Sequence, residues 1–184
     1  MTSIAELFCV FIRSSFGGAE KNRLYDYIWK HYRRRVAFYI SGYVSPGHPG
    51  FDDLLQEVMI KIYKNLHTFN PLHSFKAWVY QIARRHCLDF LKSRDERLAP
   101  DSLPNDPPQS GTRSPESLLM QSELFGLIDR SLRSLPRVDQ EISFLRFYEN
   151  LRYYEIARIV GMNANTVKAR IHEIKERLKK DLSA

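Results

Sequence analysis

Short polar and basic side chains at helical spacing near the C-terminus could bind DNA bases. Asn165, Thr166, Lys168, Ala169 and His172 project from one side of a predicted helix, flanked by Arg170, Lys175 and Lys179. Amides and lysines can reach base edges in a major groove, and cations can contact phosphates. Two carboxylates on the same helix, Glu173 and Glu176, weaken this interpretation because they repel phosphates. A basic, solvated helix in any small bundle is the alternative reading.

The apolar residues around this helix favour DNA binding over that alternative. Ile156, Ala157 and Val160 precede Gly161, and Val167, Ile171, Ile174 and Leu178 follow it. Both sets have helical period, so each predicts one buried stripe. Glycine readily takes the left-handed conformation that ends a helix. Two short helices joined at Gly161, with a small residue at Ala157, predict a helix-turn-helix.

Composition favours a polyanionic partner in a reducing compartment. The 184 residues include 28 Lys and Arg against 21 Asp and Glu, a formal net charge of +7. Such an excess suits nucleic acid or an anionic membrane surface. Cys9 and Cys87 form no CxxC pair, so a cytoplasmic location fits better than a disulfide framework. The N-terminus does not have the pattern of a secretion signal, and no apolar run reaches the roughly 20 residues of a membrane span.

The remaining chain predicts an all-α protein with two small helical domains. Apolar residues recur at helical period over residues 3–12, 19–44, 52–66, 74–93, 118–132 and 139–148. Residues 95–114 are rich in Pro, Asp and Ser, which predicts a flexible linker. The domains are therefore expected at residues 1–94 and 115–184. The extended linker would span roughly 70 Å, so the domains could sit far apart on one large partner.

Two surfaces of the N-terminal domain are candidate binding sites. Asp53, Gln56, Glu57 and Ile60 form a second stripe on the helix at 52–66, which could dock another helical protein. The alternative is a partly solvated helix side. On the helix at 74–93, which Ser74 is expected to cap, the predicted outer face interleaves aromatic and cationic residues, as single-stranded nucleic acid binding requires. This face comprises Lys76, Tyr80, Gln81, Arg84, Arg85 and Lys92, with Trp78 at its border. The alternative is that the two aromatic residues belong to the core.

Three segments resemble bacterial RNA polymerase sigma factors of the extracytoplasmic-function (ECF) type. They are DDLLQEVMIKIYKNLHTF (52–69), FKAWVYQIARRHCLDFLKSR (75–94) and SLPRVDQEISFLRFYENLRYYEIARIVGMNANTVKARIHEIKERL (134–178). Their order and spacing are more specific than a lone helix-turn-helix. The resemblance implies a factor that binds core RNA polymerase and directs promoter recognition, melting and transcription initiation, with no catalysis, cofactor or metal of its own. Anti-sigma factors are common partners in such families, although no residue here identifies one.

The family assigns a role to each candidate surface. The resemblance implies that Asp53, Gln56, Glu57 and Ile60 bind the polymerase. It implies that the loop at 69–74 and the helix after it open and read the minus-ten promoter element. The candidates there are Asn70, Lys76, Trp78, Tyr80, Arg84 and Arg85. It implies that the helix within 163–177 reads the minus-thirty-five element, with Asn165, Thr166, Lys168, Ala169, Arg170 and His172 as candidates.

Three positions depart from the family pattern. Many relatives have Asn at the position that Arg85 occupies here, beside the site that receives a flipped minus-ten base. This chain could therefore prefer a different base there. Many have Arg or Lys at Glu173, which leaves the minus-thirty-five preference open. Arg152 stands where a Ser usually caps the first helix of the helix-turn-helix, and losing such a cap costs roughly 1 kcal/mol.

Three other functions remain in competition. A free-standing regulator could bind duplex DNA as a dimer, but the 52–66 stripe and the 74–93 face would then be unexplained. A metal enzyme has little support, because no HExxH, CxxC or phosphate-binding loop occurs. A protein that occupies polymerase without starting transcription is opposed by the basic recognition helix, although Glu173 and Arg85 leave it open.

Overall fold

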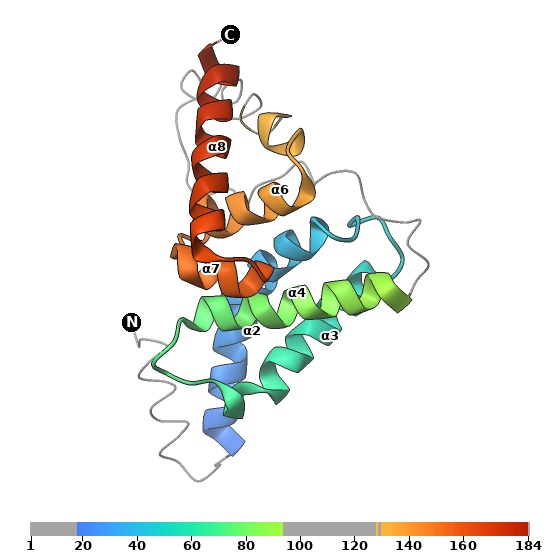
Figure 1. Cartoon of the computed structure of the whole chain (residues 1–184). Helices are drawn as coiled ribbons and strands as arrows, with labels where there is room; N and C mark the ends of the chain where they lie inside the picture. Colours follow the sequence, from blue (N-terminus) through green and yellow to red (C-terminus); the bar gives the residue numbers. More distant parts are fainter. Residues whose placement is uncertain (1–17, 94–127, 129, 184) are drawn as a thin grey trace, which may run out of the picture.

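All regular secondary structure in the described part of the chain is helical. The computed structural model describes residues 18–93, 128 and 130–183. The predicted helix at 3–12, the linker at 95–114 and most of the predicted helix at 118–132 therefore lie outside the described residues. The elements in Figure 1 are α2 (Gly18–Ser41), α3 (Phe51–Lys64), η1 (Leu66–Thr68), α4 (Phe75–Ser93), α6 (Arg137–Ser143), η3 (Phe144–Tyr148), α7 (Tyr153–Val160) and α8 (Ala164–Ser183). The prediction of an all-α fold with a C-terminal helix-turn-helix is confirmed.

The N-terminal unit comprises α2, α3, η1 and α4, which pack around a shared apolar core. Val36 of α2, Val58 and Ile62 of α3, and Ala83 of α4 are fully buried. The Ser74 hydroxyl accepts the Ala77 N–H at 3.3 Å, so Ser74 caps α4 as its sequence position predicted. Capping and core packing together fix the direction in which α4 presents its side chains.

The C-terminal unit comprises α6, η3, α7 and α8. The predicted helix at 139–148 begins two residues earlier, at Arg137, and its last five residues form a π-helix. Glu149 N–H donates to the carbonyl oxygen of Phe144, five residues back, at 3.1 Å. Asn150 then takes a left-handed conformation, with φ of 55°. The chain thus turns sharply between η3 and α7, immediately after Glu149.

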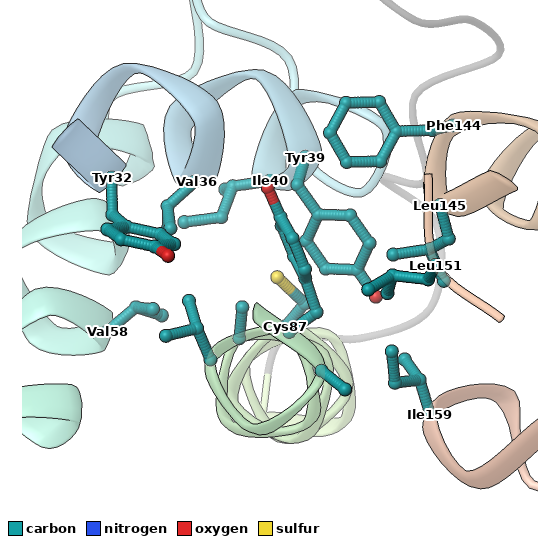
Figure 2. Close-up of a cluster of buried hydrophobic side chains, with 14 of the residues drawn as sticks. Tyr32, Val36, Tyr39, Ile40, Val58, Cys87, Phe144, Leu145, Leu151 and Ile159 are labelled. Carbon is teal, nitrogen blue, oxygen red and sulfur yellow. The ribbon is translucent and has the colours of Figure 1, made fainter. Parts of the chain in front are cut away.

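The two units share one continuous core in this structure. Figure 2 shows α4 nearly end-on, with Val36 and Val58 on one side and Leu145, Leu151 and Ile159 on the other. All five side chains are almost completely buried. In Figure 1, α7 lies directly against α4, while α8 extends away from the N-terminal unit. Helix α4 is therefore enclosed by both units, whereas the linker had suggested that they could sit far apart.

Candidate nucleic-acid interface

The helix-turn-helix has the geometry that its sequence predicted. Gly161 has φ of 73° and ψ of 36°, in the left-handed region. The N–H groups of Gly161 and Met162 both donate to the carbonyl oxygen of Ala157, at 2.9 and 3.0 Å. This arrangement closes the last turn of α7. Val167 and Ile171 are then buried against the preceding helices, so the opposite side of α8 is left at the surface.

The predicted recognition face of α8 is exposed, with one partial exception. Asn165, Thr166, Lys168, Ala169 and His172 are exposed. Arg170 is half-buried, and its Nη1 donates to Asp139 Oδ1 of α6 at 2.7 Å. Arg170 therefore fastens α8 to α6 in this structure. The other five side chains form an open polar surface near the N-terminal end of α8, where backbone N–H groups also favour anions.

Two helix starts are stabilised by side chains that the sequence analysis did not name as caps. The Arg152 position lacks a side-chain acceptor, but its backbone N–H donates to Glu155 Oε2 at 2.7 Å. Glu155 thus supplies half of a capping box. At the start of α8, Asn163 Oδ1 accepts the Asn165 N–H at 2.8 Å. Asn163 was missed as a cap, although an Asn just before a predicted helix is a recognisable signal.

The predicted minus-ten residues are divided between exposed and covered positions on the N-terminal unit. Arg85 is exposed on α4, and Asn70 is exposed in the preceding loop, where its Oδ1 accepts the Leu72 N–H at 3.0 Å. Trp78 is half-buried, with its ring 5.5 Å from that of Phe75. Lys76 and Arg84 are half-buried beneath the C-terminal unit. Arg85, Asn70 and Trp78 therefore form the accessible part of this candidate site.

The placement of Tyr80 on the outer face of α4 was wrong. Its side chain is fully buried, with its ring 5.0 Å from Tyr39 and 5.7 Å from Phe144. Burial raises the pKa of Tyr80 well above its ordinary value, and the nearby Glu149 carboxylate raises it further. The aromatic residue belongs to the shared core because the C-terminal unit covers the side of α4 that a lone helix would leave in water.

The acidic stripe on α3 is at the surface, as predicted. Asp53, Gln56 and Glu57 are exposed, and Ile60 retains 40% of its accessible surface. The apolar face of the same helix, which includes Val58 and Ile62, is fully buried. An exposed isoleucine one turn after exposed carboxylates is chemically suited to a partner helix that is both apolar and basic.

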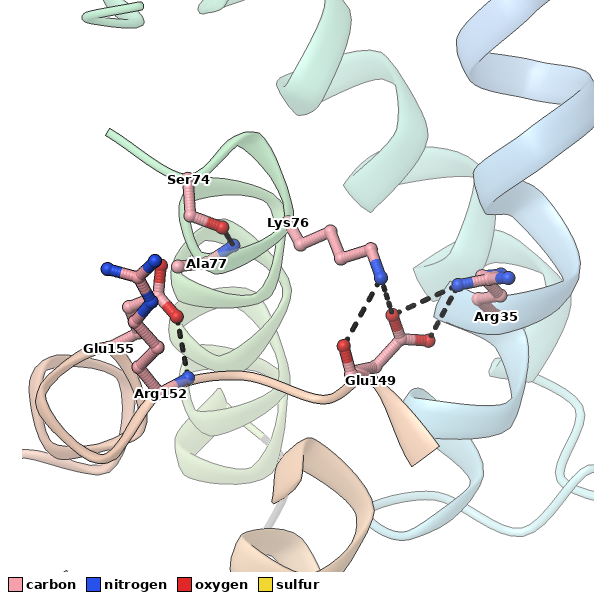
Figure 3. A network of polar contacts seen from close by, with 7 residues as sticks. All are labelled: Arg35, Ser74, Lys76, Ala77, Glu149, Arg152 and Glu155. Atoms are coloured by element: carbon pink, nitrogen blue, oxygen red, sulfur yellow. Dashed lines mark hydrogen bonds and ion pairs between the residues drawn. The ribbon is translucent and has the colours of Figure 1, made fainter. Parts of the chain in front are cut away.

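Glu149 is a buried residue that the sequence analysis missed. Its side chain has no exposed surface, and Figure 3 shows Arg35 and Lys76 directed at it. Arg35 Nη1 lies 3.1 Å from one carboxylate oxygen, and Lys76 Nζ lies 3.6 Å from the same oxygen. Lys76 also donates to the Glu149 backbone carbonyl at 3.2 Å. Two cations of the N-terminal unit thus compensate one buried carboxylate of the C-terminal unit.

Glu141 makes a second contact of the same kind and was also missed. Arg84 Nε donates to its carboxylate at 3.1 Å, and the Tyr39 hydroxyl donates to the same oxygen. Burial raises the pKa of Tyr39 well above its usual value, and the Glu141 carboxylate contributes to the same shift. The available sequence signal was an acid at each end of the mostly apolar segment 142–148, in a chain with an excess of cations.

An open groove of about 720 Å³ lies beside these contacts, between α4 and α7. Its lining includes Gln81, Arg85 and Lys92 of α4 and Arg158 of α7, together with Asp89. Arg85, Lys92 and Arg158 are all exposed. The groove therefore has an excess of positive charge next to the position where Arg85 departs from the family pattern.

Among the described helices, none is long and apolar enough to cross a membrane.

Comparison with known proteins connects both units with transcription. The sigma-70 region 2 family matches residues 28–97, and the sigma-70 region 4 family matches residues 125–178. The chain is 31% identical over 153 residues to the ECF RNA polymerase sigma-E factor of Escherichia coli, covering 79% of each chain. It is 26% identical over 162 residues to the sigma-E factor of Haemophilus influenzae, covering 84% of this chain and 85% of the relative.

Two solved structures share the fold. One is the sigma factor RpoE in complex with the anti-sigma factor NepR from Bartonella quintana, with a TM-score of 0.62 and 19% identity. That match covers 86% of this chain and 96% of the other. The second is CnrH in complex with the cytosolic domain of CnrY, with a TM-score of 0.59 and 16% identity. It covers 97% of this chain and 96% of the other.

Proposed function

The chain belongs to the ECF family of RNA polymerase sigma factors, and from this premise we propose how its surfaces serve polymerase and promoter. It binds core RNA polymerase and directs promoter recognition, promoter melting and transcription initiation. The observation that most supports this function is that both units match, in order, sigma regions 2 and 4. A free-standing regulator is not favoured, because it would need only the second unit.

The α3 stripe is the proposed polymerase-docking site. Asp53, Gln56, Glu57 and Ile60 are exposed together on one side of a helix whose opposite side is core. Carboxylates steer a basic surface toward the stripe, and Ile60 supplies apolar area that becomes buried on docking. The exposure of all four residues supports this assignment.

The loop at 69–74 and helix α4 are the proposed minus-ten site. Asn70, Trp78 and Arg85 are accessible there, and Lys76 and Arg84 add charge on the same helix. Aromatic faces stack on unpaired bases and cations hold the strand's phosphates, which offsets the cost of unstacking a base. Tyr80 takes part only if the C-terminal unit moves away, since its side chain is buried here.

Helix α8 is the proposed reader of the minus-thirty-five element. Its exposed residues Asn165, Thr166, Lys168, Ala169 and His172 lie at the N-terminal end of a helix in a helix-turn-helix, the end that contacts base edges in such motifs. Arg170 acts through its ion pair with Asp139, which sets the angle of α8 against α6. Glu173 is exposed on the same helix, where it would repel a nearby phosphate.

The protein acts in the cytoplasm and without catalysis of its own under this proposal. Bond formation belongs to the polymerase, and the sigma factor supplies binding energy and position. An anti-sigma factor is a further proposed partner. The solved neighbour RpoE is in complex with the anti-sigma factor NepR, and it supports that proposal because its fold is shared over 86% of this chain.

Run-off transcription tests the proposed function. Purified protein is added to sigma-free core polymerase on a template pool with randomised minus-ten and minus-thirty-five elements. We expect start-site-specific transcripts from a selected subset of templates. Arg85→Asn is expected to shift the selected minus-ten sequence, because it restores the residue common in relatives. Binding to polymerase without transcripts would indicate an occupying protein, and duplex binding without polymerase binding would indicate a free-standing regulator.

A further inference from the structure

Glu173 is an acidic residue on the exposed side of α8, the proposed recognition helix. Val167, Ile171 and Ile174 form the buried side of this helix. At 3.6 residues per turn, Glu173 projects from the other side, together with Asn165. Both side chains are exposed, and α8 extends away from the N-terminal unit in Figure 1. A carboxylate therefore stands on the surface that is proposed to contact a DNA duplex.

The two cations at helical spacing from Glu173 are directed at other residues. Arg170, three residues before it, donates from Nη1 to Asp139 Oδ1 of α6 at 2.7 Å. Arg177, four residues after it, donates from Nη2 to Ser134 Oγ at 3.0 Å. These are the positions from which a helical neighbour compensates a carboxylate. Among the described residues, none forms an ion pair or a hydrogen bond with the Glu173 carboxylate.

Two acids close to Glu173 are compensated, which makes its free carboxylate distinctive. Glu176, one turn further along α8, accepts a hydrogen bond from Lys179 Nζ at 2.6 Å. This hydrogen bond and the charge of Lys179 lower the pKa of Glu176 below its usual value. Glu155 of α7 accepts the Arg152 N–H at 2.7 Å. Glu173 therefore retains its full capacity to accept hydrogen bonds from a ligand.

A free carboxylate on a DNA-facing helix discriminates between bases by charge. Phosphates repel it, and so do the acceptor atoms of the base edges in the major groove. Guanine presents two acceptors there, thymine presents an acceptor and a methyl group, and adenine presents an acceptor beside its amine. Cytosine presents the N4 amine as a donor, without an acceptor of its own. Cytosine is therefore the base that a carboxylate fits best.

The neighbouring side chains leave room for such a contact. Ala169, one turn before Glu173, is exposed and ends at its Cβ, so α8 can approach the floor of a groove closely. Glu173 lies about 12 Å beyond Asn165 along α8, at 1.5 Å per residue. Successive base pairs are about 3.4 Å apart, so the two residues face different base pairs.

We propose that Glu173 reads a cytosine in the minus-thirty-five element by accepting a hydrogen bond from the N4 amine of that base. The carboxylate rejects the other three bases because it sets an acceptor against their acceptors. Glu173 therefore contributes to the choice of promoter more than to affinity. This proposal rests on the proposed function, because the assignment of the minus-thirty-five duplex to α8 comes from there.

Selection from a pool of duplexes by the full-length protein tests the proposal. The pool carries randomised minus-thirty-five positions and needs no polymerase, because the α8 face is exposed in the protein alone. We expect the wild type to enrich cytosine at one position about tenfold over the other bases. At that position, Glu173→Arg should select guanine and Glu173→Gln should select adenine, since these side chains form bidentate contacts with those bases. Preferences at the other positions should remain.

Asp181→Asn is the matched control. It makes the same charge change as Glu173→Gln, about two turns further along α8, and should leave every base preference unchanged. Circular dichroism establishes that each variant retains its helices.

A modified base tests the atom concerned. N4-methylcytosine at the selected position replaces the amine hydrogen that faces the major groove with a methyl group. By fluorescence anisotropy, the wild type should bind this duplex about tenfold more weakly than the unmodified one. Glu173→Ala should bind the two duplexes equally, because it has no acceptor to lose.

The outcomes separate this proposal from the proposed function. If Glu173→Gln raises affinity equally for all duplexes and leaves the selected sequence unchanged, Glu173 only repels phosphates and the proposal is overturned. A wild-type preference that survives in Glu173→Arg overturns it as well. In both cases the selected sequence still supports α8 as the reader. If the wild type selects no base at any position, the assignment of α8 to the minus-thirty-five element fails, and this proposal fails with it.

Discussion

Gly161 has a left-handed backbone conformation, and the space around it is open enough for a larger side chain. Its φ is 73°, and a Cβ built there would have nothing within 4 Å. Gly161→Ala should therefore destabilise the C-terminal unit by about 1–2 kcal/mol through backbone conformation alone. Urea denaturation followed by circular dichroism measures this loss, and Gly161→Asn should lose less because Asn tolerates this region better.

Gly47 provides the control for that experiment. It lies in an exposed turn outside the left-handed region, and a Cβ there would meet only Ser45 Oγ at 4.0 Å. Gly47→Ala should leave stability unchanged or raise it slightly. Equal losses at the two glycines would contradict the conformational explanation for Gly161.

Cys87 is a buried thiol whose reactivity should report on folding. Burial raises its pKa above the ordinary thiol value, although the positive charge of Arg137 opposes the shift. Little of the Cys87 thiol is ionised at about pH 8, and the surrounding core shields its sulfur from reagents in solution. In a Cys9→Ser background, we expect slow reaction with a thiol-specific disulfide reagent in buffer and fast reaction in denaturant. Fast reaction of the native protein would contradict this placement.

At the scale of elements, α8 makes the most specific prediction. Asn165→Ala should weaken binding to a duplex carrying the selected minus-thirty-five element by about 1–3 kcal/mol, with relaxed preference at one base position. Lys180→Ala, exposed near the far end of α8, is the control and should have a much smaller effect. Fluorescence anisotropy with matched and mutated duplexes measures both. Equal losses on all sequences would show that Asn165 does not read a base.

The buried side of a helix with one apolar stripe could be predicted from the sequence. The buried sides of α4 could be predicted only in part. The helix-turn-helix followed from Gly161 and the apolar residues at 167–174, because their signals are local. Tyr80 was assigned to the surface because periodicity describes a helix with one covered side. Helix α4 is covered on two sides, and the second cover, Phe144, is distant in sequence. The π-helix at Phe144–Tyr148 also gave no signal in the apolar pattern.

The candidate sites show the same division. The α3 stripe and the α8 face are exposed as predicted, since each lies opposite a strong apolar stripe. Glu141 and Glu149 could not be placed, because their burial depends on cations of another unit. From sequence alone, a carboxylate is expected to be exposed to solvent unless its cationic partners are known. Contacts between units therefore required the structure.

At the scale of the whole molecule, aromatic packing and ion pairs join the two units in this structure. Ion pairs within the contact should weaken as salt competes for the same charges. We expect the radius of gyration of the wild type to rise with salt concentration, whereas a Glu141→Gln/Glu149→Gln variant, which lacks these carboxylates, should change little. Small-angle scattering over a salt series measures this difference, and parallel curves for the two proteins would contradict it.

The most direct test of the central claim is run-off transcription from a selected promoter with Asp53→Ala/Glu57→Ala. If α3 docks this sigma factor on core polymerase, the variant should lose nearly all transcript while its binding to minus-thirty-five duplex remains unchanged. Asp26→Ala/Asp181→Ala, with the same charge change outside the candidate binding residues, should transcribe as the wild type does. Full transcription by the α3 variant would contradict the assignment of this stripe to the polymerase. Absence of transcript with the wild type itself would contradict the function as a whole.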